Sequence, residues 1–277
     1  MLVVATLSLK GGVGKTTVAL GLAGAALHHE VRTLVVDLDP QANSTIALDP
    51  EPTSATVADV LDDPRRSVLH GAIARSGWGD GLDVLVGAEQ TERHNHPDPG
   101  PKQLDQLRRA LHRLVDADGL LGGGPDDDSD PYRLVIIDCP PSLGQLTRSA
   151  LAAAHRAVLV TDPTMFAVSG VQRAFDAVQT ERKRGNSDLQ PLGVLINRVR
   201  PRNTEHEFRI SELRELFGPL VLSGVLPDRS AIQQAQAPAC PSSAGTRRVR
   251  ARRRRCSPCC SAGCCAATAA ASPATSR

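Results

Sequence analysis

Aromatic residues are scarce in this 277-residue chain, where Phe, Trp and Tyr occupy only 2% of the positions. Hydrophobic residues still make up 41% of the chain, so its core has to be built from Leu, Val, Ile and Ala. No apolar run approaches membrane-spanning length, and no basic-then-apolar leader opens the sequence. We therefore expect a cytoplasmic protein with no membrane partner, large enough for one α/β domain and a tail.

Cysteine and acidic residues are unevenly distributed. Only Cys139 lies within residues 1–238, and the other six cysteines lie within residues 239–277. That last segment also carries eight Arg and no Asp or Glu, which leaves 24 basic against 30 acidic residues in 1–238. A disulfide framework is not expected in the cytoplasm. These counts divide the chain into a mildly acidic domain, 1–238, and a strongly basic tail, 239–277.

Short apolar runs alternate with helical patterns along the domain. Strands are expected at 2–7, 33–36, 82–86, 134–137, 157–160, 192–196 and 221–225. Helices are expected at 17–28 and 102–115 and between the later strands, with a loop at 116–131. Continuous apolar strands that alternate with helices predict an α/β fold with a mostly parallel β-sheet and helices on both faces.

A glycine-rich loop joins the first expected strand to the first helix, and its sequence is Lys10-Gly11-Gly12-Val13-Gly14-Lys15-Thr16-Thr17. Small glycines let backbone N–H groups converge on phosphate oxygens, and the helix N-terminus adds a favourable dipole. We expect Lys15 to reach the terminal phosphates of ATP and Thr16 to offer its hydroxyl to Mg²⁺. The loop predicts a P-loop NTPase-like fold, in a variant form because Leu9 stands where the general pattern has Gly. The alternative is an ordinary glycine-rich turn.

Carboxylates follow two of the expected strands. Asp138 ends the most hydrophobic strand, where a carboxylate can hold Mg²⁺ opposite a phosphate loop. Asp37 and Asp39 end another strand, and ligands of open α/β sheets gather at that edge. We expect Asp39 to orient an attacking water and Asp37 to support the metal shell. The alternative is a strand-terminating turn closed by Pro40.

Three motifs together resemble the ParA/MinD family of deviant Walker A ATPases. They are Lys10-Gly-Gly-Val-Gly-Lys-Thr-Thr, Asp37-Leu-Asp-Pro-Gln and Asp138-Cys-Pro-Pro-Ser-Leu. Within that family the chain is most similar to short-type ParA partition proteins, which lack an N-terminal DNA-binding domain. The resemblance runs from Met1 to about Pro238.

The resemblance implies specific roles for residues of this chain. Lys10 matches the signature lysine that reaches across an ATP-dependent homodimer to the partner's phosphates, and Gly11 matches the glycine that lets the two loops approach. Asp39 matches the aspartate that supports hydrolysis. Asn197 resembles the asparagine that contacts adenine, and Pro227 resembles a proline beside the base. Turnover is expected to be slow and stimulated by a partner.

The family also implies nonspecific DNA binding through basic residues on the dimer surface. Candidate residues here follow the strand at 192–196 and are Arg198, Arg200, Arg202, Arg209, Arg214 and Arg229. Clustered arginines suit phosphate contacts and salt-dependent affinity. The alternative is a solvated helical face, because glutamates are interleaved, and Asp228 stands where ParA proteins often carry Arg.

The leading hypothesis is a chromosome- or plasmid-partitioning ATPase that is nucleoid-associated and works with a ParB-like centromere-binding partner. One alternative is a ParA-like ATPase that positions a protein cargo. Another is a hydrolysis-impaired nucleotide-binding protein, if the tail has damaged the dimer. A MinD-type membrane cycle needs an amphipathic C-terminal helix, which the tail as written does not contain. An iron–sulfur reductase of the nitrogenase type needs paired cysteines within the domain, where this sequence has only Cys139.

The tail at 239–277 departs from the family, which continues with a strand and a final helix. Cys256-x-x-Cys259 with Cys264-Cys265 could bind zinc or an iron–sulfur cluster, or Arg247–Arg255 could be a DNA-binding arm. The third hypothesis is a frameshift near 236–239. If the third base of each codon is joined to the first two bases of the next, a Cys codon yields Leu, Met or Val, and a Ser codon of the TCN type yields Phe, Leu, Ile or Val. Residues 256–265 then become apolar at the spacing of a helix. A frameshifted tail would not be folded.

Overall fold

The computed structural model describes residues 1–114 and 131–228. The tail hypotheses for 239–277 and the end of the expected domain at 238 lie outside these residues. The same holds for the expected loop at 116–131, except for its last residue. Within the described part, no helix has both the length and the hydrophobicity that a membrane crossing requires.

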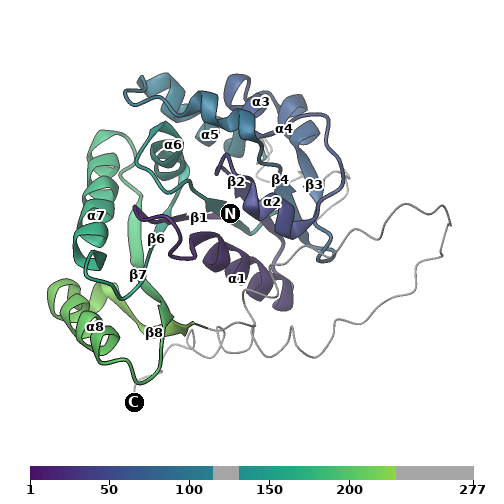
Figure 1. Ribbon diagram of the computed structural model, residues 1–277. Coiled ribbons are helices and arrows are strands. Elements are labelled where there is room, and N and C mark those ends of the chain that lie inside the picture. Colours follow the sequence, from purple (N-terminus) through teal and green to yellow (C-terminus); the bar gives the residue numbers. More distant parts are fainter. Residues whose placement is uncertain (115–130, 229–277) are drawn as a thin grey trace, which may run out of the picture.

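The described chain forms one eight-stranded sheet between two layers of helices (Figure 1). Its strands are β1 (Leu2–Leu7), β2 (Thr33–Asp37), β3 (Ile73–Arg75), β4 (Leu82–Leu85), β5 (Leu134–Asp138), β6 (Arg156–Thr161), β7 (Gln190–Val199) and β8 (Val221–Pro227). Their order across the sheet is β3-β4-β2-β5-β1-β6-β7-β8. Only β3 runs antiparallel to its neighbour, so the expected mostly parallel α/β sheet is confirmed.

The helices occupy both faces of this sheet. They are α1 (Lys15–His28), α2 (Asn43–Leu48), α3 (Val57–Asp62), α4 (Arg66–Ala72), α5 (Pro101–His112), α6 (Gln145–Ala153), α7 (Ala167–Arg184) and α8 (Thr204–Phe217), with 3₁₀ turns at Glu89–His94 and Gly218–Leu220. Helices α1 and α2 lie against one face, and α5, α6 and α7 lie on the other (Figure 1).

Alternating residues of the strands explain why both layers are needed. Along β1, Val3, Ala5 and Leu7 belong to the large apolar cluster that includes residues of α5, α6 and α7. Val4 points to the opposite face and packs with Val18 of α1. Both faces of the central strands are therefore apolar and buried, as expected for a parallel sheet covered by helices.

Candidate functional site

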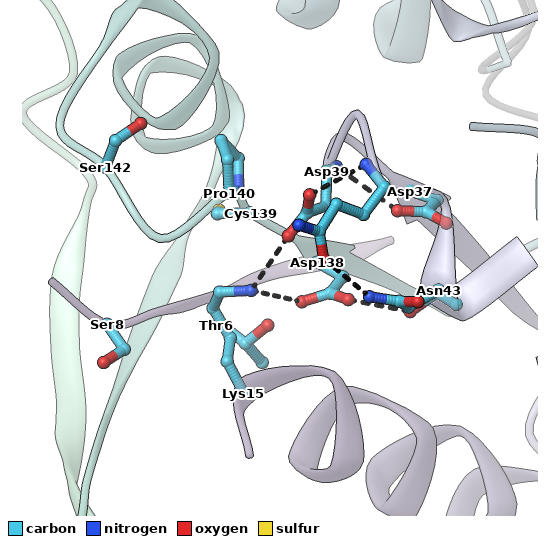
Figure 2. Close-up of polar contacts among 12 residues, drawn as sticks. Thr6, Ser8, Lys15, Asp37, Asp39, Asn43, Asp138, Cys139, Pro140 and Ser142 are labelled. Carbon is cyan, nitrogen blue, oxygen red and sulfur yellow. Dashed lines mark hydrogen bonds and ion pairs between the residues drawn. The ribbon is translucent and has the colours of Figure 1, made fainter. Parts of the chain in front are cut away.

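The carboxyl ends of β1, β2 and β5 meet at one edge of the sheet. In the strand register Asp37 lies opposite Asp138, and Thr6 of β1 is the other neighbour of Asp138. Lys15, which follows the loop between β1 and α1, points toward Asp39 and Asp138, so the end of the expected phosphate loop and the expected acidic residues converge (Figure 2). Ligands of open parallel sheets bind at such an edge, where the strand order reverses.

The phosphate loop has the backbone that its glycines predict. Gly12 has a φ of 78° and Gly14 a φ of 87°, both in the left-handed region that favours glycine. A Cβ on Gly14 would lie 2.3 Å from Nδ2 of Asn197, whereas a Cβ on Gly11 or Gly12 would meet nothing within 4 Å. The loop is therefore held tightly against β7 at Gly14 and is open at Gly11 and Gly12.

Gly14 precedes the first residue of α1 and has no side chain to cap it. The first backbone N–H groups of a helix have no partner within the helix, and they attract anions. Thr16 and Thr17 are half-buried in the first turn. This end of α1 therefore offers backbone and hydroxyl groups that fit phosphate and Mg²⁺.

Lys15 points into the group of carboxylates. Its Nζ lies 3.2 Å from Oδ1 of Asp138 and 3.7 Å from Oδ2 of Asp39, and the residue is only 7% exposed. Burial lowers the pKa of Lys15, but the neighbouring carboxylates, Asp138 foremost, outweigh it and the net shift is upward. Lys15 is therefore a fixed positive charge beside the open part of the loop, suited to an anionic phosphate.

Asp138 is fully buried and each of its oxygens has a partner. Oδ1 accepts a hydrogen bond from Lys15 Nζ, and Oδ2 accepts one from the hydroxyl of Ser44 at 2.8 Å. Among the described residues no group of three or more acidic, Cys or His side chains forms a metal cage. Mg²⁺ commonly uses one or two carboxylates together with substrate phosphates and water. Asp138 and Thr16 suit that mode of binding.

Asp37 faces away from Lys15 and serves the adjacent helix. Its Oδ2 accepts hydrogen bonds from Thr45 N at 2.8 Å and Thr45 Oγ1 at 2.9 Å, and its Oδ1 accepts one from Asp39 N at 3.2 Å. Burial, followed by the charge of Asp138, raises the pKa of Asp37 to about 7. These contacts make Asp37 a positioning residue in this arrangement, and the expected metal role of Asp37 stays a prediction.

Asp39 follows the end of β2 by two residues and is only 6% exposed. Its Oδ1 accepts a hydrogen bond from Gln41 N at 3.0 Å, while its Oδ2 faces Lys15. The structure thus brings Asp39 to the lysine of the phosphate loop, and its expected role in hydrolysis stays a prediction.

Lys10 stands apart from Lys15. Its side chain is 44% exposed, and its Nζ donates to Asp162 at 2.8 Å and to Thr164 Oγ1 at 3.2 Å. Both acceptors follow β6, on the side of the loop away from Asp138. The two lysines of one loop therefore have different environments: one is buried between Asp39 and Asp138, and the other is at the surface.

Asn197, at the end of β7, is 4% exposed and donates from Nδ2 to the carbonyl oxygen of Val13 at 2.7 Å. In the described chain Asn197 therefore anchors the phosphate loop, and its contact with adenine stays a prediction. Pro227 is half-buried at the end of β8, opposite Val199 in the register, and its place beside the base also stays a prediction.

The arginines expected to contact DNA differ in whether their side chains already have a partner within the chain. Arg200 pairs with Asp228 at 3.0 Å, Arg209 pairs with Glu205 and Glu212, and Arg214 donates to the carbonyl oxygen of Ser223. Arg198 and Arg202 are exposed, have positive φ values of 58° and 61°, and have no partner among the described residues. Arg229 lies outside the described residues. Among the described candidates, the two arginines without a partner therefore lie at the end of β7 and in the turn that follows it.

Several site residues were not anticipated. Ser44 and Thr45 bind the two buried carboxylates, and Asp162 binds Lys10. Ser44 and Thr45 follow the acidic motif directly, so a run of hydroxyl residues beside Asp37 and Asp39 was the available signal. Asp162 had no comparable signal, because its contact spans 152 residues along the chain.

Comparison with known proteins supports a nucleotide site. A family model described as "AAA domain" matches residues 1–191. Sporulation initiation inhibitor protein Soj of Bacillus subtilis is 29% identical over 235 residues, which cover 84% of this chain and 87% of Soj. Chromosome partitioning protein ParA of Myxococcus xanthus is 32% identical over 229 residues, which cover 79% of this chain and 72% of that protein.

A solved structure of similar fold carries the expected ligands. Cobyrinic acid a,c-diamide synthase of Mycobacterium smegmatis, with bound ADP and magnesium, superposes with a TM-score of 0.70 at 27% identity. The match covers 85% of this chain and 91% of that one. The same enzyme has also been solved with an ATP analog and magnesium. ATP and Mg²⁺ are therefore the cofactors that this site fits.

Proposed function

This chain belongs to the AAA domain family as a P-loop ATPase of the ParA/MinD type, and we propose that it is a slow, dimeric ATP switch that partitions DNA. The observation that carries the proposal is the exposed Lys10 beside the phosphate loop, in addition to the buried Lys15. A protein that binds ATP alone has no need of the second lysine. Two relatives from the partition and sporulation group support the assignment.

Binding of ATP falls to residues of one chain. Lys15 and the N–H groups at the start of α1 would hold the phosphates, and Thr16 and Asp138 would hold Mg²⁺, which would neutralise phosphate charge. Asp39 lies beside Lys15 and orients the water that attacks the terminal phosphate. An O–H group of that water needs a fixed hydrogen-bond acceptor, and the carboxylate of Asp39 is held in place by the bond it accepts from Gln41 N.

Dimer formation uses Lys10 from each partner. Two ATP molecules held face to face bring dense negative charge together, and a lysine supplied across the interface offsets it. Gly11 and Gly12 leave open space above the loop, so a second loop can approach closely. Hydrolysis and release of phosphate then remove the negative group that Lys10 contacts across the interface, and the dimer separates. A ParB-like partner accelerates hydrolysis.

DNA binding uses Arg198 and Arg202, the exposed arginines that lack acidic partners among the described residues. Arg198 follows Asn197, which is bonded to the phosphate loop, so the nucleotide site and this surface share one strand end. The ATP-bound dimer would present two copies of the surface to the DNA backbone, and its affinity would fall steeply with salt.

Co-sedimentation with nonspecific DNA tests the proposal. The wild type should sediment with DNA only when Mg²⁺ and ATP are present, and doubling the salt should weaken this association severalfold. Lys15→Ala should abolish both ATP binding and sedimentation, because it removes the buried charge beside the phosphates. Lys102→Ala, at an exposed lysine of α5, is the matched control. ATP-independent sedimentation, or an unchanged Lys15 variant, would refute the proposal.

A second test concerns the water-orienting role of Asp39. Asp39→Ala should bind ATP but hydrolyse it at least ~100-fold more slowly, in the range expected for loss of a general base. The ATP-bound dimer should then accumulate and be visible by size-exclusion chromatography with light scattering. Asp188→Ala, at an exposed position, should behave as wild type. Normal turnover in Asp39→Ala would remove that role.

A further inference from the structure

Helix α2 is tied at its beginning to the two buried carboxylates of the site. The hydroxyl of Ser44 donates to Asp138 Oδ2 at 2.8 Å, and Ser44 is fully buried. Thr45 donates to Asp37 from both its backbone N and its Oγ1. Thr45 Oγ1 also accepts a hydrogen bond from Gly87 N at 2.9 Å. The position of this turn therefore depends on the carboxylates.

The other end of α2 is tied to a surface loop. The indole Nε1 of Trp78 donates to the carbonyl oxygen of Ala47 at 2.8 Å. The carbonyl oxygen of Leu48 accepts from Ser76 Oγ at 2.9 Å and from Gly77 N at 2.8 Å. Gly77 approaches so closely that a Cβ there would lie 2.9 Å from the backbone oxygen of Asp49.

The two sets of anchors are joined by a short, stiff element. Helix α2 has six residues, and a helix of that length spans about 9 Å. Leu48 is fully buried in the apolar cluster beneath α1, so the helix cannot slide freely. A displacement of Ser44 therefore has to be taken up by the helix as a whole, including its bonds to Ser76, Gly77 and Trp78.

We propose that Ser44 is a positioning residue for Asp138 and that α2 transmits the occupancy of the Mg²⁺–ATP site to Trp78. Lys15 and Asp138 are bonded to each other, and both are the residues that would hold phosphate and metal. Ligand binding must therefore redistribute the contacts of Asp138, including the one to Ser44. A ligand shifts a protein element only when the contacts of that element differ between the ligand-free and the ligand-bound chain. The bond between Ser44 and Asp138 supplies such a difference.

Trp78 is a natural reporter for this connection. It is the only tryptophan of the chain, and its side chain is 40% exposed at the molecular surface. Its indole N–H is bonded to α2 itself, so a shift of the helix alters both the hydrogen bond and the exposure of the ring. The inference depends on ATP binding alone and goes beyond the partition function.

The test is tryptophan emission of the full chain during titration with Mg²⁺–ATP, with binding measured separately by calorimetry. The wild type should show a saturable change at the concentrations where calorimetry detects binding. Ser44→Ala should bind ATP within about tenfold of wild type, because one buried hydrogen bond is lost, yet show less than half of the emission change. A full emission change in Ser44→Ala, or none in the wild type, would overturn the inference.

Ser76→Ala tests the far end of the same connection and decides the matter if Ser44→Ala does not fold. It removes the bond that Ser76 Oγ donates to Leu48 and the one that it accepts from Trp78 N at 3.1 Å, and it touches no residue of the nucleotide site. It should also reduce the emission change. An undiminished change in Ser76→Ala would contradict the role of α2. Thr180→Ala is the control, since it removes a hydroxyl that is bonded to a helix carbonyl on the exposed face of α7. DNA binding plays no part in any of these measurements, so their failure is separable from that of the partition proposal.

Discussion

Two lysines five residues apart lie in different surroundings, which suit them to different tasks. Lys15 starts α1 and is buried between Asp39 and Asp138, where water cannot screen its charge. Lys10 lies before the glycines at the surface, and its ion pair with Asp162 is partly solvated. Exposed ion pairs contribute little free energy, typically under about 1 kcal/mol. The Lys10 pair can therefore be exchanged for another anion at small cost.

Asp162→Asn should make the ATP-bound dimer easier to form. In the described chain Asp162 holds Lys10, and the substitution removes the competing charge while it keeps the size of the side chain. Each dimer breaks two such pairs, so pairs worth up to about 1 kcal/mol each correspond to a shift of up to about 30-fold in the protein concentration at half-dimerisation. Analytical ultracentrifugation with Mg²⁺ and ATP measures this shift. Asp188→Asn is the control, and weaker dimerisation of the Asp162 variant would contradict the argument.

At the scale of elements, the long buried strands could be predicted from the sequence, because continuous apolar runs such as 134–137 have no other place than a covered sheet. Antiparallel β3 was missed since three residues, Ile73–Arg75, are too few to establish a period. Helix α2 was missed for a related reason. Its six residues, Asn43–Leu48, read locally as a turn after the acidic motif. The helix is held in place by the nearby Asp37 and by Asp138 and Trp78, which are distant in the sequence.

The candidate site also contains residues that could be predicted from the sequence and contacts that could not. Gly12, Gly14 and Lys15 could be placed from the sequence because a local motif dictates both the backbone and the charge. The contact of Asn197 with Val13 was not foreseen, because it joins residues 184 positions apart. Partners that come together only through the sheet order leave no local trace in the sequence. The bonds of Asp37 to Asp39 and Thr45 are local, and its expected metal role stays a prediction.

His155 joins three strands and makes their pairing sensitive to pH. Its Nδ1 accepts from Val3 N at 3.0 Å, so the neutral ring is the form that fits. Its backbone also bonds to Val3 of β1 and to Gln190 of β7. Burial, followed by the positive N-terminus and Arg156, lowers the pKa of His155. The folded chain therefore binds fewer protons than the unfolded chain at mildly acid pH.

The stability contributed by neutral His155 should be complete above about pH 6.5, the usual pKa of His, and be lost as the pH falls below it. His155→Asn keeps an acceptor near Val3 N without a titrating ring, so its Tm should vary less between about pH 5 and pH 7. The difference should stay below about 1 kcal/mol because the ring is partly exposed. Thermal melts across this range measure it. His29→Asn should keep the wild-type slope, and an equal slope in the His155 variant would contradict the assignment.

At the scale of the whole molecule, charge is divided unevenly between residues 1–238 and the expected tail, 239–277. Residues 1–238 carry 24 basic and 30 acidic residues, whereas 239–277 carry eight Arg and no acidic residue. A basic segment binds DNA without regard to nucleotide, because its charge is permanent. Binding that depends on ATP must instead come from residues whose arrangement the nucleotide changes. Arg198 meets this requirement, since its neighbour Asn197 is bonded to the phosphate loop.

The last prediction separates the two sources of DNA affinity in the full chain. Replacing the seven arginines between 247 and 255 with Gln should lower ATP-independent retention on DNA but leave the ATP-dependent increase within about threefold. The double substitution Arg198→Gln and Arg202→Gln should do the reverse and reduce the ATP-dependent increase at least ~10-fold, while each lost phosphate contact lowers the salt slope by about 0.9. Arg173→Gln, on α7, is the control. If only the tail variant loses the ATP-dependent increase, the tail binds DNA in the ATP-bound state, and Arg198 and Arg202 do not.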